Sequence, residues 1–118
     1  MIQNVIIGTV KRLKLTIIPQ DNAVFNIGEH EGYIHFFCSE TVEKVFRLSN
    51  FGSNTYKDTY ESIDETDNSC VISLNTADVG CGRLKARVEV YIPEGTSSSG
   101  RKEIYDIMTN INIVSGLK

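Results

Sequence analysis

The sequence predicts an all-β protein built as an antiparallel β-sandwich of about seven to eight strands. Two segments, residues 84–92 and 105–113, alternate strictly between apolar and polar side chains. A period of two is typical of a strand with one buried and one solvent-facing side. The other apolar segments are short, with turn residues about every ten positions, and none has the period of a long amphipathic helix.

The two alternating segments predict a long C-terminal hairpin. The first places five apolar residues on one face: Leu84, Ala86, Val88, Val90 and Ile92. Pro93 and the polar residues 94–100 form the predicted loop, and residues 105–113 repeat the alternation. An isolated hairpin is not stable in water, so a second sheet is expected to cover its apolar face.

Shorter strands are predicted upstream of the hairpin. Residues 2–8 and 13–17 form either two strands or one strand broken at Gly8. Further strands are predicted at residues 33–38, 45–48, 56–63 and 71–74, with an acidic surface loop at residues 64–68. Residues 75–80 predict one helical turn, capped by Asn75 or Thr76 and closed by Gly80 in a left-handed conformation.

Length and composition indicate a single domain over residues 1–118. Of the 118 residues, 41% are apolar, which is enough for a core without disulfides or metal. The formal charge of −3 gives no general attraction for nucleic acid, so no nucleic-acid partner is expected. No apolar run could cross a bilayer, and the first residues lack a signal-peptide pattern. We therefore expect no membrane partner and a cytoplasmic site of synthesis.

Few residues are candidates for metal binding or catalysis. Glu29, His30, Glu31 and His35 lie close in sequence, but two carboxylates and one histidine lack the closed ligand set of typical metal centres. Charged turn residues beside a histidine on a sheet surface are the better interpretation, so no metal and no cofactor are expected. Residues 61–67 lack the alternation and central glycine of a calcium loop. There is no Gly-x-Ser-x-Gly motif, so no catalytic residues and no enzymatic activity are expected.

The three cysteines contain no Cys-x-x-Cys pair. Cys38 and Cys70 are predicted to serve as small apolar residues within strands. Cys81 lies between Gly80 and Gly82 and is the candidate for a reactive thiol, but no histidine lies near it in sequence to activate it.

Aromatic residues supply the candidate contact surface. Four of them are candidates for contacts with a protein or a sugar: Phe51, Tyr56, Tyr60 and Tyr91. Tyrosine is also common in strands for packing alone, and both interpretations stay open.

The C-terminal half resembles a known kind of module. It has a strand at residues 71–74, the turn Thr76-Ala77-Asp78, a long strand that starts at Gly82-Arg83-Leu84, a polar loop, and a final strand that follows Arg101-Lys102-Glu103. This order is similar to the N-terminal immunoglobulin-like module of phage and prophage baseplate or tail-tip proteins, including baseplate upper proteins. Residues 11–18 fit the first strand of that module, whereas residues 4–10 depart from its polar lead. The resemblance implies an immunoglobulin-like sandwich in a multimeric setting, without catalysis or cofactor, and it transfers no functional residue.

Two functional hypotheses follow from the sequence, and a third, a hydrolase, would need a cluster of acids or a histidine–carboxylate pair in a pocket. The first is a non-enzymatic structural or adaptor protein of a phage-like (prophage) tail or baseplate. Such a protein would be a homo-oligomer that contacts other particle proteins, made in the bacterial cytoplasm and then part of the virion. The alternative is a carbohydrate-binding or adhesive β-sandwich, although the absence of tryptophan weighs against sugar stacking. Whether residues 2–7 pack on their own core or are donated to a neighbour stays open.

Overall fold

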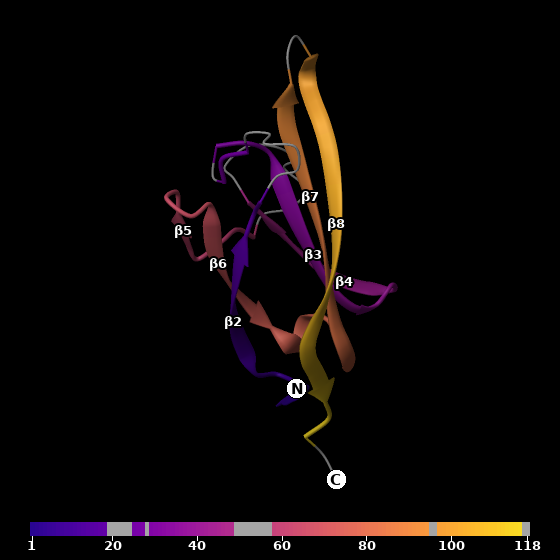
Figure 1. Ribbon diagram of the computed structural model, residues 1–118. Helices are drawn as coiled ribbons and strands as arrows, with labels where there is room; N and C mark the ends of the chain where they lie inside the picture. Colours follow the sequence, from indigo (N-terminus) through magenta and orange to yellow (C-terminus); the bar gives the residue numbers. More distant parts are fainter. Residues whose placement is uncertain (19–24, 28, 49–57, 95–96, 117–118) are drawn as a thin grey trace.

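The computed structural model describes residues 1–18, 25–27, 29–48, 58–94 and 97–116, which form two packed sheets (Figure 1). The larger sheet has the strand order β1 (Gln3–Ile6), β8 (Ser97–Val114), β7 (Gly82–Glu94), β3 (Gly32–Ser39) and β4 (Val42–Arg47). The smaller sheet has the order β2 (Val10–Thr16), β6 (Ser69–Asn75) and β5 (Ser62–Asp64). Strand neighbours are antiparallel, except that β1 runs parallel to β8.

The predicted all-β, sandwich-like architecture is confirmed. Among the described residues the only helical element is η2 (Thr76–Asp78), a single 3₁₀ turn where one helical turn was predicted. Asn75 caps it by accepting a hydrogen bond from the Ala77 amide at 3.0 Å, and Gly80 has φ +81°. The core lies between the two sheets and includes Ile72 and Leu74 of β6 and Leu84 and Val88 of β7.

The predicted C-terminal hairpin is present and is longer than expected. β7 and β8 pair from Gly82 opposite Ile113 to Glu94 opposite Ser97. The prediction of a loop over residues 94–100 is therefore wrong in extent, because Glu94 and residues 97–100 belong to the strands. Backbone pairing does not require apolar side chains, and serine carries no backbone restriction that would end a strand. In Figure 1 this end of the hairpin extends beyond the other described strands.

A β-bulge bends β8 near its C-terminal end. The register with β7 shifts between Arg83 and Lys85, so that residues 109–111 oppose the single residue Leu84. The Thr109 hydroxyl donates to the Leu84 carbonyl at 2.7 Å and accepts from the Ile111 amide at 3.1 Å. The bulge therefore separates residues 101–108 of β8, which pair regularly with β7, from residues 111–114, which pair with β1.

The first two strands lie in different sheets. The chain crosses between the sheets at Gly8, whose φ of +97° favours glycine. The fully buried Thr76 fixes this crossing, because its hydroxyl donates to the Thr9 carbonyl at 2.8 Å and accepts from the Gly8 amide at 2.9 Å. Val5 of β1 belongs to the core, so the N-terminal run packs on its own sandwich.

The turn between β5 and β6 is anchored by Asn68. This residue has φ +58°, a left-handed conformation that asparagine tolerates. Its side-chain carbonyl accepts from the Ile27 amide at 2.8 Å, and its side-chain amide donates to the carbonyls of Ile17 at 3.0 Å and Phe25 at 2.8 Å. One turn residue thus holds two segments that lie about forty to fifty positions earlier in the chain.

Candidate interaction surface

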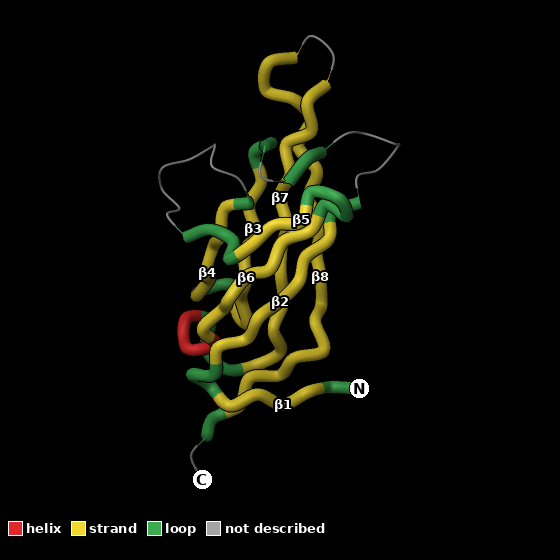
Figure 2. The backbone as a smooth tube through the Cα atoms, turned by 90° about the vertical axis from the view of Figure 1, so that its left-hand side faces the viewer, coloured by secondary structure: helices red, strands yellow, loops and turns green. Residues whose placement is uncertain are grey.

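On one side of the sandwich, here called the open side, no described strand closes the space between the edges of the two sheets. β2 is an edge strand of the smaller sheet, and Figure 2 shows it on the same side of the sandwich as β8. β8 pairs with β1 only over residues 111–114. Among the described strands, none pairs with the second edge of β8 over residues 97–110. A long strand edge with unpaired backbone groups is a ready template for another strand.

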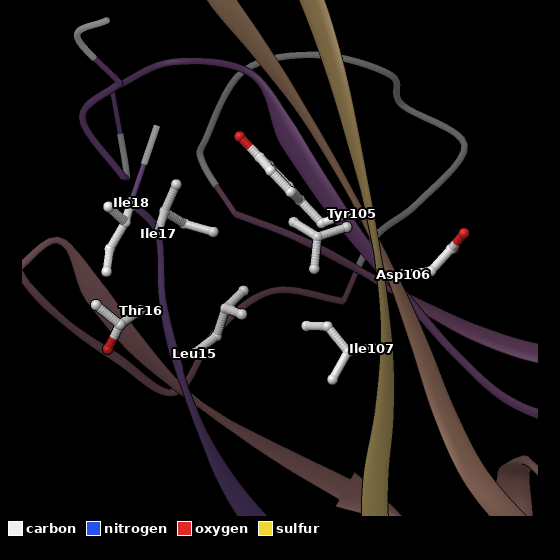
Figure 3. A pocket seen from close by; sticks show the side chains of 8 residues that line it. Leu15, Thr16, Ile17, Ile18, Tyr105, Asp106 and Ile107 are labelled. Atoms are coloured by element: carbon white, nitrogen blue, oxygen red, sulfur yellow. The ribbon is translucent and has the colours of Figure 1, made fainter. Parts of the chain in front are cut away.

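An apolar groove of about 350 Å³ lies beside this edge (Figure 3). Leu15, Ile17 and Ile107 point into the groove, and the Asp106 carboxylate points away from it. Ile18 and Tyr105 extend the lining, and a smaller hollow of about 130 Å³ continues past Leu15 and Ile107. Such a lining offers apolar contact area, which suits the binding of an apolar group.

The outer face of the larger sheet carries several polar and aromatic side chains that contact one another. Arg87 donates to Asp106 at 2.8 Å and lies 5.8 Å from the Phe37 ring centroid. His35 lies between two carboxylates, 3.3 Å from Glu43 and 3.4 Å from Glu89. Arg87 and His35 thus each lie beside an acidic side chain of the same chain.

The residues weighed as metal ligands are not gathered by the fold. His30 accepts a hydrogen bond from the Asn26 amide at 2.9 Å, and Glu31 accepts one from the Tyr33 hydroxyl at 2.6 Å. His35 lies on β3 beside Glu43 and Glu89, away from Glu29. In the described parts of the chain no cluster of three or more potential ligands could hold a metal ion.

The candidate aromatic residues are placed only in part. Phe51 and Tyr56 lie outside the described residues. Tyr60 is half-buried and packs against the core. Tyr91 packs edge-on against Tyr33 on the outer face of the larger sheet, with ring centroids 6.3 Å apart. The two described tyrosines thus make different contacts, and their role in binding stays a prediction.

The residues of the open side were not identified from the sequence. The sequence nevertheless holds an indication, because Ile104, just before the second alternation, and Met108, within it, are apolar at positions that face away from the core. They are 51% and 60% exposed. Apolar residues at solvent-facing positions of an edge strand mark a contact surface.

The cysteines differ in burial, which gives a testable prediction. Burial raises the pKa of Cys70 to about 11 and also raises that of Cys38, whose Sγ lies 3.4 Å from the Gly80 carbonyl oxygen. Cys81 is exposed. Because the thiolate is the reactive form, at pH 8 we expect one thiol, Cys81, to react quickly with a disulfide reagent and the other two only on unfolding. A Cys81→Ser variant should lose the fast phase, and retention of that phase would contradict the assignment.

The comparisons with known proteins give no relative. No family model, curated protein or solved structure matches this chain. Among the described residues there is also no helix of the length and apolar character needed to span a membrane.

Proposed function

We propose that this chain is a non-enzymatic structural or adaptor protein that acts through protein–protein contacts on the open side of its sandwich. The observation that supports this proposal is the coincidence of the apolar groove with the edge of β8 that no described strand pairs with. A partner strand placed there gains backbone hydrogen bonds from β8 and apolar contacts from the groove. Neither gain requires a catalytic group.

An immunoglobulin-like topology is part of the same proposal. The order β2-β6-β5 corresponds to strands B, E and D of that fold, and β8-β7-β3-β4 corresponds to G, F, C and C′. The parallel pairing of β1 with β8 fits a first strand that crosses to the second sheet. This correspondence agrees with the module that the C-terminal half resembles. We therefore propose that the protein belongs to the tail or baseplate of a phage-like particle, with other particle proteins as partners.

The proposal is tested by co-expressing the tagged chain with the products of the genes adjacent to its own. We expect a stoichiometric complex with at least one of them, and a loss of about tenfold in affinity for Ile107→Asp, because a charge would face the apolar groove. Val42→Asp is the matched control: Val42 is 48% exposed, Ile107 is 38% exposed, and Val42 lies on β4 at the opposite edge of the larger sheet.

Two results would contradict this function. One is that no neighbouring gene product binds. The other is a complex that Val42→Asp weakens as much as Ile107→Asp, which would move the contact away from the open side. The carbohydrate-binding alternative has no specific support in the structure, because Tyr60 and Tyr91 make separate contacts within the fold.

A further inference from the structure

We propose that a second copy of this chain binds at the free edge of β8, with the two β8 strands antiparallel about a two-fold axis at Ile104. The inference names one partner for the open side and so rests on the proposed function. It joins two five-stranded sheets into one continuous sheet through an isologous interface.

The part of β8 whose second edge no described strand pairs with has the right extent for this pairing. Residues 101–108 pair regularly with β7 between two register shifts, and Ile104 lies near the middle of that stretch. With the axis at Ile104, residue 98 of the second copy lies opposite Asn110. β1 begins to pair with β8 at Ile111, so the added strand ends where β1 starts.

The two faces of the sheet restrict the register. Directly opposed residues of antiparallel strands point to the same face, and a shift by one residue places the inner face of one strand against the outer face of the other. On β8, Tyr105 pairs with the buried Val88 and faces inward, whereas Asp106 pairs with Arg87 and faces outward. The two-fold axis must therefore lie between two copies of the same residue, and not between two successive residues. The residues nearest the middle of the stretch 101–108 are Glu103, Ile104 and Tyr105.

Charge selects Ile104 among these three. An axis at Glu103 opposes two copies of that carboxylate, and an axis at Tyr105 places Lys102 opposite Met108. An axis at Ile104 places Lys102 of each copy opposite Asp106 of the other, which gives two outward-facing ion pairs. Both side chains are exposed, and Asp106 already accepts from Arg87 at 2.8 Å. On the inner face the same register places Glu103 opposite Tyr105, two side chains that already hydrogen-bond to each other within one chain.

The apolar residues of the outer face agree with this axis. Ile104, which is 51% exposed, comes to lie against its own copy across the axis. Opposed apolar side chains on neighbouring strands stabilise a sheet, and pairing removes both the exposed isoleucines and the open backbone edge from water.

The test exchanges charges between copies. The wild-type chain is expected to show a monomer–dimer equilibrium by size exclusion with light scattering across a concentration series. Lys102→Asp and Asp106→Lys should each weaken the homodimer by about tenfold, because each variant replaces two attractive pairs with two repulsive ones. A mixture of the two variants should dimerise about as well as wild type. In the mixed dimer the aspartate introduced at position 102 lies opposite the lysine introduced at position 106, and the second pair is the unchanged Lys102 opposite the unchanged Asp106.

Glu65→Lys, in the exposed turn between β5 and β6, is the control that changes the charge by the same amount as Asp106→Lys, and it should leave the dimer unchanged. Circular dichroism confirms that each variant folds. A wild-type monomer at all concentrations overturns the inference, as does a mixture that dimerises no better than its components. The proposed function is refuted by a different result, the absence of binding to any neighbouring gene product. A chain that binds such a product but stays monomeric would refute only the dimer.

Discussion

Replacing Asn68 by alanine is expected to lower the free energy of unfolding by about 3 to 5 kcal/mol. The substitution removes three side-chain hydrogen bonds to the backbone of Ile17, Phe25 and Ile27, all of which are buried. Each buried backbone group left without a partner costs about 1 kcal/mol or more, and alanine tolerates the φ of +58° less well than asparagine. Urea unfolding followed by circular dichroism measures the change.

Two further variants at this position separate the effect of the lost hydrogen bonds from the effect of the left-handed backbone conformation. Asn68→Gly keeps the left-handed backbone and removes only the side chain, so it should be more stable than Asn68→Ala by about 1 kcal/mol. Asn68→Asp keeps an acceptor for the Ile27 amide but places a carboxylate oxygen against two carbonyl oxygens, so it should be as destabilising as alanine. An alanine variant that loses less than about 1 kcal/mol would show that this turn does not anchor the residues before β3.

The second large effect is expected for Leu84→Ala in β7, with a loss of about 3 to 5 kcal/mol. Leu84 is 0% exposed and packs between the two sheets beside the β8 bulge. Replacing its isobutyl side chain by a methyl group leaves a cavity that the bulge cannot collapse into, because Thr109 fixes the local backbone through the Leu84 carbonyl. The loss is a large fraction of the stability of a domain of this size, so thermal unfolding should shift markedly downward.

Leu13→Ala in β2 is the matched control, since the same atoms are removed from a half-buried position at the open side. We expect a loss of about 1 to 2 kcal/mol there, because water already reaches part of the side chain. Equal losses of unfolding free energy for Leu84→Ala and Leu13→Ala would mean that β7 does not contribute a fully buried core position.

The strands could be predicted from sequence where one face is buried and the other is not. The alternation at residues 84–92 and 105–113 identified β7 and β8, and the residue types at 75–80 identified the single helical turn. The end of the hairpin could not be predicted, because serine and glycine are typical of loops, whereas backbone pairing with β7 continues through them.

The open side could not be predicted in the same way. The groove is made by Leu15 and Ile107, which are remote in sequence and lie in different sheets, so only the relative position of the sheets brings them together. The anchoring role of Asn68 depends in the same manner on Ile17, Phe25 and Ile27. A local pattern identifies a strand or a turn but not its distant neighbours.

The parallel pairing of β1 with β8 has a consequence for how the chain folds during synthesis. β1 leaves the ribosome before the other described strands, yet its partner residues 111–114 emerge more than a hundred positions later. Until then Val5 has no cover, and the emerging chain exposes an apolar segment to chaperones and to other nascent chains. Contacts between such distant segments raise the contact order, so we expect the docking of β1 to be a late step of folding.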